Sequence, residues 1–302
     1  MKLLPALLLA LQMTPPAAPP PPDPETLRQA FLTRFNQERQ AAGLPPLVLV
    51  DTLTRIAQET AEDVRKSKAA PFEERAIRDI RLRIARAGYE AHGWSYSFAV
   101  TPGDVEEVYS WWKTSNADAT ERLLDPDYRE IGIGVGEYES TPLYTFLFAW
   151  RESEYFARQT EGLTDLEEVR RAMLARVNAE RARAGVRPLS LDPSLNAAAQ
   201  AHAEDMLARS YYNHESPEGK RPRDRVQAQG YLGRIVGENI ARGALSVDEA
   251  VDGWLRSTEH RRNLLHGGFV DLGVGLAVGK GTTGYTAVWV QNFGAPQGVR
   301  LP

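Results

Sequence analysis

The pattern of apolar and polar positions in the second half of the chain predicts three helices. The first begins at residues 164–165, keeps apolar residues at helical spacing and ends near Gly185. The second begins at Asp192, an N-cap residue that precedes a proline. The third begins at Ser246, which opens a capping-box sequence and is followed by an apolar stripe that includes Trp254.

Two strand-like runs follow these helices. They cover residues 272–278 and 285–293 and are joined by the glycine-rich loop 279–284. Helices that alternate with a few antiparallel strands are typical of an α/β sandwich, in which helices cover both faces of a small sheet. We therefore expect an α/β fold of this kind.

The same plan occurs twice in the chain. Segment 35–43 reappears as 177–185, and Trp112 pairs with Trp254 at the same offset. The glycine-containing runs 131–135 and 272–276 also pair, at an offset that is shorter by a single position. A nearly constant offset across half a chain indicates a tandem duplication. We assign the two domains to residues 25–157 and 158–302.

Composition narrows the range of functions. The 302 residues are enough for two domains, and a formal net charge of -4 gives no indication of nucleic-acid binding. The chain has no cysteine, which excludes disulfides, thiol catalysis, iron–sulfur clusters and cysteine zinc sites.

The amino terminus has the pattern of a secretory signal. One lysine precedes a short apolar run in residues 1–11, and this run is too short to span a bilayer. We assign residues 1–18 to a signal peptide and the proline-rich residues 19–24 to a linker. The expected location is therefore secreted, extracellular or periplasmic, with no transmembrane segment in the mature chain.

Three polar residues on separate segments of the second half form a candidate site. His214 is expected in a loop after the second helix, Glu238 follows a glycine, and His260 is expected nearly two turns beyond Trp254 on the third helix. The corresponding segments of the first half lack all three residues. Residues that disappear while a fold persists are not needed for folding, which favours a functional role.

Several roles fit this residue set. Two imidazoles and one carboxylate can give three ligands to a divalent metal such as zinc, with one position open. The same residues can instead form a hydrogen-bonded His–Glu network without metal. A hydrolase would further need a general base and a carbonyl-polarising group, and Glu259 is the only additional carboxylate that stands out. His202 is interpreted as a histidine at the edge of the core.

Short motifs of the second half resemble those of the CAP superfamily, which groups cysteine-rich secretory proteins, antigen five and plant pathogenesis-related proteins. The motifs occur along the chain in the same order as in the family. The chain is most similar to the bacterial branch, which also lacks cysteine. The first half resembles a degenerate copy. The matching segments are 178–181, 213–219, 237–241, 257–265, 272–275 and 291–294.

The resemblance implies an α/β/α sandwich with a cleft of two histidines and two acidic residues, where some members hold a divalent metal. His214, Glu238 and His260 match three of these positions. The fourth differs, because Ser257 stands where eukaryotic members have glutamate and Glu259 where bacterial members have glycine. We include both as further cleft candidates.

We therefore expect a secreted bacterial binding module with a metal-capable cleft, no organic cofactor, and a small-molecule, lipid or envelope ligand. One alternative is a metal-dependent hydrolase or protease that acts on extracellular or cell-wall polymers. A second is a lipid- or sterol-binding module, for which Trp94, Tyr96, Trp111 and Trp112 are candidates to line an apolar cleft.

Overall fold

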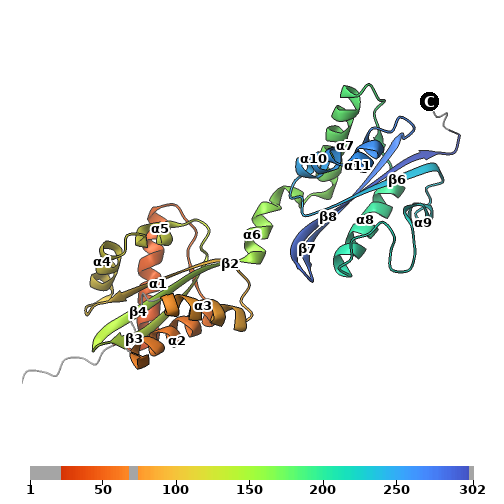
Figure 1. Ribbon diagram of the computed structural model, residues 1–302. Coiled ribbons are helices and arrows are strands. Elements are labelled where there is room, and N and C mark those ends of the chain that lie inside the picture. Colours follow the sequence, from red (N-terminus) through yellow and green to blue (C-terminus); the bar gives the residue numbers. More distant parts are fainter. Residues whose placement is uncertain (1–21, 68–73, 299–302) are drawn as a thin grey trace, which may run out of the picture. The chain divides into compact units, whose positions relative to one another are not determined.

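The computed structural model describes residues 22–67 and 74–298. The chain forms two compact units that divide between Trp150 and Arg151 (Figure 1). The division precedes the boundary we set at residues 157 and 158, which falls inside a helix of the second unit, α6 (Glu152–Gln159). The predicted signal peptide lies outside the described residues.

The first domain carries a four-stranded sheet in the order β1-β3-β4-β2. β1 pairs with β3 in parallel, and β3 pairs with β4 antiparallel. Its first helix begins at Pro24 with Asp23 as N-cap, so folded structure starts within the predicted linker. The elements are α1 (Pro24–Ala41), β1 (Val48–Leu49), α2 (Asp51–Ser67), α3 (Glu74–Arg86), β2 (Ala91–Val100), α4 (Val105–Ser115), α5 (Ala119–Leu124), β3 (Glu130–Tyr138) and β4 (Thr141–Arg151).

The second domain repeats this topology in the order β5-β7-β8-β6, with β5 parallel to β7 and the other pairs antiparallel. After α6 come a short 3₁₀ helix (Glu161–Leu163), α7 (Leu166–Arg183), β5 (Ser190–Leu191), α8 (Pro193–Ala208), α9 (Pro222–Ala228), β6 (Gly233–Arg242), α10 (Val247–Arg256), α11 (Thr258–Leu264), β7 (Asp271–Gly281) and β8 (Gly284–Pro296). Strand β6 therefore lies at an edge of the sheet.

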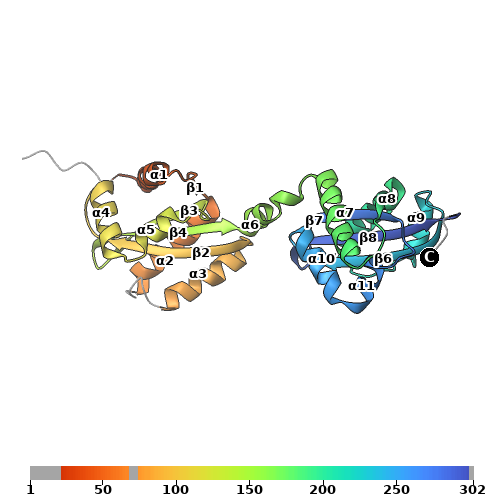
Figure 2. The same ribbon diagram turned by 90° about the horizontal axis from the view of Figure 1, so that it is seen from above.

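Helices cover both faces of each sheet (Figures 1 and 2). In the second domain α7, α10 and α11 share one apolar core with the sheet, and α8 shares another on the opposite face. In the first domain α1, α4 and α5 pack on one face and α2 and α3 on the other. The predicted α/β/α sandwich is thus confirmed in both copies.

Glycines in the second-to-last strand of each domain, β3 and β7, allow one helix to lie directly on the sheet. This helix is α2 in the first domain and α8 in the second. A Cβ atom on Gly273 would come within 2.1 Å of the backbone carbon of Leu195 in α8. A Cβ atom on Gly132 would come equally close, at 2.1 Å, to the backbone carbon of Leu53 in α2. Glycine is required at these positions because no other residue lacks the Cβ atom that would collide.

The predicted helix starts agree with the structure, but one helix is shorter than expected. Asp165, Asp192 and Ser246 are the N-caps of α7, α8 and α10. Ser257 leaves the helical conformation, with φ -94° and ψ 126°, and ends α10. His260 therefore lies on the separate helix α11, and the prediction that it continues the helix of Trp254 was wrong.

A buried arginine ties the end of α11 to α7. Arg181 is fully buried, and its guanidinium donates to the carbonyl oxygens of Leu264 at 2.8 Å, His266 at 3.2 Å and Phe269 at 3.3 Å. Burial lowers the pKa of Arg181 to about 10. In the first domain the equivalent Arg39 donates to carbonyl oxygens that have the same spacing along the chain, those of Leu123, Asp125 and Tyr128.

No helix in the described parts of the chain combines the length and apolar character that a membrane crossing requires.

The aromatic residues considered for a lipid cleft contribute to the cores of the first domain. Trp112 is fully buried, and its indole N–H donates to Ser97 at 2.6 Å. Trp111 packs against the same core, and Trp94 and Tyr96 pack against the core on the α2 and α3 face.

Candidate functional site

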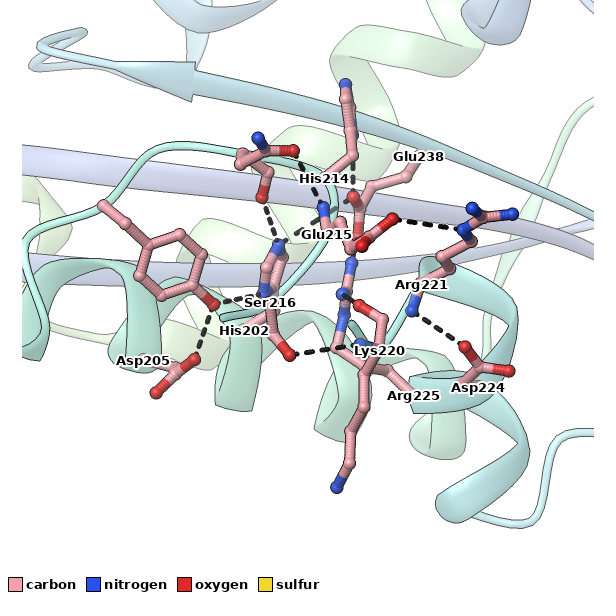
Figure 3. Close-up of polar contacts among 12 residues, drawn as sticks. His202, Asp205, His214, Glu215, Ser216, Lys220, Arg221, Asp224, Arg225 and Glu238 are labelled. Atoms are coloured by element: carbon pink, nitrogen blue, oxygen red, sulfur yellow. Dashed lines mark hydrogen bonds and ion pairs between the residues drawn. The ribbon is translucent and has the colours of Figure 1, made fainter. Parts of the chain in front are cut away.

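Glu238 is the centre of the polar cluster in the second domain. Its side chain, on edge strand β6, is 1% exposed. One carboxylate oxygen, Oε1, lies 2.8 Å from Nδ1 of His214. The other, Oε2, accepts a hydrogen bond of 2.6 Å from Nη2 of Arg225 on α9 (Figure 3). A buried carboxylate with these partners has its charge compensated and its geometry fixed.

A third donor reaches Glu238 from the neighbouring strand. Asn292 on β8 is the register partner of Glu238. With its amide nitrogen toward the carboxylate, as its hydrogen bonds require, Asn292 donates to Oε2 at 3.2 Å and accepts from the backbone N–H of Ala199 at 3.1 Å. Both oxygens of Glu238 are therefore occupied by N–H donors of the protein itself.

His214 presents its imidazole from the loop between α8 and α9. Its side chain is 48% exposed, although Nδ1 contacts the buried Glu238. A carboxylate oxygen accepts, so Nδ1 is the donor in this contact, and Nε2 is left for a further partner. A carboxylate that fixes the tautomer of a histidine in this way is a common support for imidazoles that bind metals or accept protons.

His202 lies behind this pair and fixes the loop. The carbonyl oxygen of Asn213 accepts a hydrogen bond of 3.0 Å from Nε2 of the buried His202, and the same nitrogen is 3.9 Å from Glu238 Oε1. The hydroxyl of Tyr211 is 3.4 Å from Nδ1 and donates to Asp205 at 2.5 Å. Burial lowers the pKa of His202, which favours the neutral ring.

His260 lies close enough to the cluster to interact with it electrostatically. Burial, and then the charge of His214, lowers the pKa of His260. Two asparagines join its helix to β6, because Asn239 donates to the carbonyl oxygen of His260 at 3.1 Å and Asn263 donates to that of Glu238 at 3.0 Å. These backbone contacts hold α11 beside the edge strand.

The two remaining cleft candidates lie apart from the carboxylate. The side chain of Glu259 is 75% exposed and pairs with Arg262 at 3.0 Å. Ser257 stands at the junction of α10 and α11, where its carbonyl oxygen accepts from the backbone N–H of Arg261 at 2.8 Å. The residues that the structure brings together are therefore His214 and Glu238, with His260 alongside.

Metal binding stays a prediction. Within residues 22–67 and 74–298, no three histidine, aspartate or glutamate side chains are grouped so as to hold a metal ion. Both oxygens of Glu238 already have N–H partners, so its geometry suits the support of His214 rather than direct ligation. The groups that fit a metal are Nε2 of His214 and the ring of His260.

Sequence reasoning missed Arg225, Asn292 and the contact of His202 with the loop. The sequence pattern places the arginines on solvated helix faces, so Arg225 did not stand out. Asn292 lies in the matching segment 291–294, but that motif alone does not show that the side chain contacts Glu238. The internal repeat held one usable signal, because Arg225 and Arg83 stand at equivalent positions of the two copies. The two arginines nevertheless have different partners, because Arg225 donates to Glu238 on β6 and Arg83 to Thr60 on α2.

The first domain shows what replaces the cluster. Tyr96 stands at the position of Glu238, and its buried hydroxyl has no hydrogen-bond partner among the described residues. Ala119, fully buried, stands at the position of His260, as the matching contacts of the two buried arginines show. Thr60 replaces His202. The counterpart of His214 lies outside the described residues.

Comparison with known proteins decides the family. The sequence profile of the cysteine-rich secretory protein (CAP) family matches residues 32–149 and 174–293. The chain belongs to this family. The resemblance seen in the sequence is thereby confirmed for both copies, including the first, which lacks the histidines and the glutamate. The two copies are a CAP domain with the cluster and a CAP domain without it.

The chain is 37% identical over 116 residues to the uncharacterized protein YkwD of Bacillus subtilis (strain 168). This match covers 38% of the chain and 43% of that protein, so it spans less than half of the relative's length. The chain is also similar to an extracellular SCP-domain protein of Bacillus anthracis str. Ames, with 26% identity, a TM-score of 0.38, and 52% and 54% of the two chains covered. An outer surface protein of Borrelia burgdorferi matches with 20% identity and a TM-score of 0.40, over 44% of this chain and 96% of that one.

Proposed function

We propose that the second CAP domain is an extracellular binding module whose recognition site is His214, held by Glu238, with His260 beside it. The observation that carries this proposal is the 2.8 Å contact between Nδ1 of His214 and Oε1 of Glu238. It joins a half-exposed imidazole to a carboxylate that is almost completely buried. A ring oriented in this way presents Nε2 as an acceptor or a metal ligand.

The comparison between the two domains supports a function in binding rather than in folding. A buried ion pair such as Glu238 with Arg225 gives little net stability, because desolvation offsets the attraction between the charges. The first domain keeps the same fold with Tyr96 in place of the glutamate. The cluster is therefore dispensable for the fold, and its retention in one copy favours a role in recognition.

A divalent metal such as zinc would be held by Nε2 of His214 and the ring of His260, with Glu238 orienting the first of these. When bound, the metal would supply a Lewis acid for an oxygen or nitrogen atom of the ligand. The chain's own residues fix the tautomer of His214 and hold α11 against β6.

Calorimetric zinc titration tests the metal part of this proposal. We expect binding in the parent protein and its loss in His214→Ala and in His260→Ala. Glu238→Gln should weaken binding by roughly 10-fold to 100-fold, the usual effect of removing a residue that orients a metal ligand. His266→Ala is the matched control, because His266 is exposed and its Nδ1 accepts from Gly268 N–H outside the cluster. Equal zinc binding in the parent and all of the variants would refute the metal role.

One observation also favours a hydrolase as a second candidate. An imidazole oriented by a carboxylate, with Nε2 available, is the arrangement of a general base. Parent protein and His214→Gln are compared on peptide, ester and cell-wall substrates. Hydrolysis by the parent that disappears in the folded variant would support an enzyme, and the absence of turnover on the whole panel would contradict it.

A further inference from the structure

A pocket of about 360 Å³ lies between α8, α9 and the loop that joins them. His202 and Arg225 are part of its lining, but His214, Glu238 and His260 are not. The pocket is therefore distinct from the proposed recognition site, although two of its lining residues contact that site. Its volume is within the range of pockets that bind small molecules.

Arg225 has a donor atom in this region that no described protein atom satisfies. The side chain is 10% exposed. Nη1 donates to the carbonyl oxygen of Lys220 at 2.8 Å and Nη2 donates to Glu238, but the buried Nε has no hydrogen-bond partner within residues 22–67 and 74–298. An unpaired buried N–H is costly, and more so on a charged group, so this atom calls for an oxygen acceptor.

The first domain shows which acceptor fits an arginine at this position. Arg83, the counterpart of Arg225, places Nη1 3.1 Å from the hydroxyl of Thr60 and Nη2 against the carboxylate of Asp63. Its Nε lies 3.5 Å from a carboxylate oxygen of Glu59 on α2. Helices α3 and α9, which carry the two arginines, end at equivalent residues, so the two positions correspond.

In the second domain the residue equivalent to Glu59 is Ala201. The AED sequence that follows at 61–63 is repeated at 203–205, which fixes the alignment. Ala201 is exposed on α8 and lines the pocket. A methyl group has thus replaced the carboxylate that forms an ion pair with the arginine Nε in the first domain, and this methyl group lines the pocket.

The other charges at the pocket leave one cation without a partner. Arg209 pairs with Glu218 at 2.6 Å and with Asp205 at 3.3 Å, and the contact with Arg209 lowers the pKa of Glu218 to about 2. In the described part of the chain the ammonium of Lys220 forms no ion pair. Among the described residues, the pocket therefore has one buried donor without an acceptor, Nε of Arg225, and one exposed cation without an ion pair, Lys220. Both are complementary to an anion.

We propose that this pocket binds the carboxylate of a small-molecule ligand. The ligand carboxylate takes the place that the side chain of Glu59 holds in the first domain and accepts the hydrogen bond of Arg225 Nε. The charge of Lys220, which also lines the pocket, adds to the attraction for an anion. The first domain supplies this carboxylate from its own helix, whereas the second leaves the position to a ligand.

The test follows the arginine Nε–H signals of the ¹⁵N-labelled full chain by NMR while acetate replaces chloride at constant ionic strength. In the parent we expect a saturable shift of the Arg225 signal and none of the Arg83 signal, because the carboxylate of Glu59 already pairs with Arg83 Nε. Ala201→Glu should abolish the acetate-dependent shift, because it restores a carboxylate to α8. Ala197→Glu is the matched control, since residue 197 is exposed on the same helix and does not line the pocket.

Lys220→Gln should weaken acetate binding by roughly threefold, the effect of removing one exposed charge. An Arg225 signal that does not respond to acetate in the parent would overturn the proposal. A shift of undiminished size in Ala201→Glu would overturn it as well. Inorganic phosphate is the comparison anion, and tighter binding of phosphate than of acetate would refute the assignment to a carboxylate.

Discussion

Tyr96 in the first domain occupies the strand position that Glu238 occupies in the second. The strands that carry them, β2 and β6, begin and end at equivalent residues. The carboxylate of Glu238 is satisfied by partners from α9 and from the loop that precedes it. The buried hydroxyl of Tyr96, by contrast, has no partner among the described residues. One position thus serves a polar cluster in one copy and is left with an unmet hydrogen bond in the other.

The unpaired hydroxyl predicts that Tyr96→Phe stabilises the first domain. Removing a buried group without a hydrogen bond should raise the free energy of unfolding by about 1 kcal/mol, because its desolvation is no longer required. Hydrogen exchange of the amides in β2 and β4 measures this change. Tyr89→Phe is the control and should lower stability, since the Tyr89 hydroxyl donates to Glu130 at 2.6 Å. A loss of stability in Tyr96→Phe would contradict the prediction.

Removal of the buried carboxylate should have the opposite effect on the second domain. Glu238→Ala leaves Arg225 with an uncompensated charge at a nearly buried position, and we expect a loss of about 3 kcal/mol in the free energy of unfolding. Denaturant unfolding measures the loss of stability, and hydrogen exchange of the amides in β8 assigns it to the second domain. Glu259→Ala should change stability by less than about 0.5 kcal/mol, because its side chain is largely exposed. Equal effects of the two substitutions would show that Glu238 is not held as described.

Substitution of a buried arginine should destabilise only the domain that contains it. Arg181→Met removes the donors for several carbonyl oxygens at the end of α11, and leaving these acceptors unpaired should cost about 3 kcal/mol. Arg39→Met should produce a similar loss in the first domain. Hydrogen exchange resolved by residue distinguishes the two domains. Arg181→Met should also broaden the NMR signals of His260, and sharp, unshifted signals would contradict the role of Arg181 in positioning α11.

The histidines predict how stability depends on pH. Burial lowers the pKa of His202 and of His260 below the usual value of 6.5. At a pH between the lowered pKa of each histidine in the folded protein and its usual value in the unfolded chain, the unfolded chain binds more protons. The contribution of the two histidines to stability is therefore complete above pH 6.5 and falls as the pH falls below it. Denaturant unfolding of the second domain at neutral and at mildly acidic pH measures this change. His202→Gln should show a smaller decrease, and a domain that becomes more stable on acidification would oppose the prediction.

Much of the fold could be predicted from local sequence. Asp165 and Asp192 cap helices because their side chains accept the first free backbone N–H groups, a property of a few adjacent residues. The extent of α10 could not be predicted in the same way. Ser257 is compatible with a continued helix, and the break there depends on the packing of α11 against β6 through Asn239 and Asn263.

Spacing and residue identity along the chain were enough to infer the duplication, the family resemblance and the residue types of the cluster. The folded structure was needed to establish that both oxygens of Glu238 are occupied, that Arg225 and Asn292 are its partners, and that Glu259 faces solvent. The physical reason is that hydrogen bonds between side chains far apart in sequence depend on how helices and strands pack. A strand pattern places a side chain on one face of a sheet, but the neighbouring elements determine which donors it meets there.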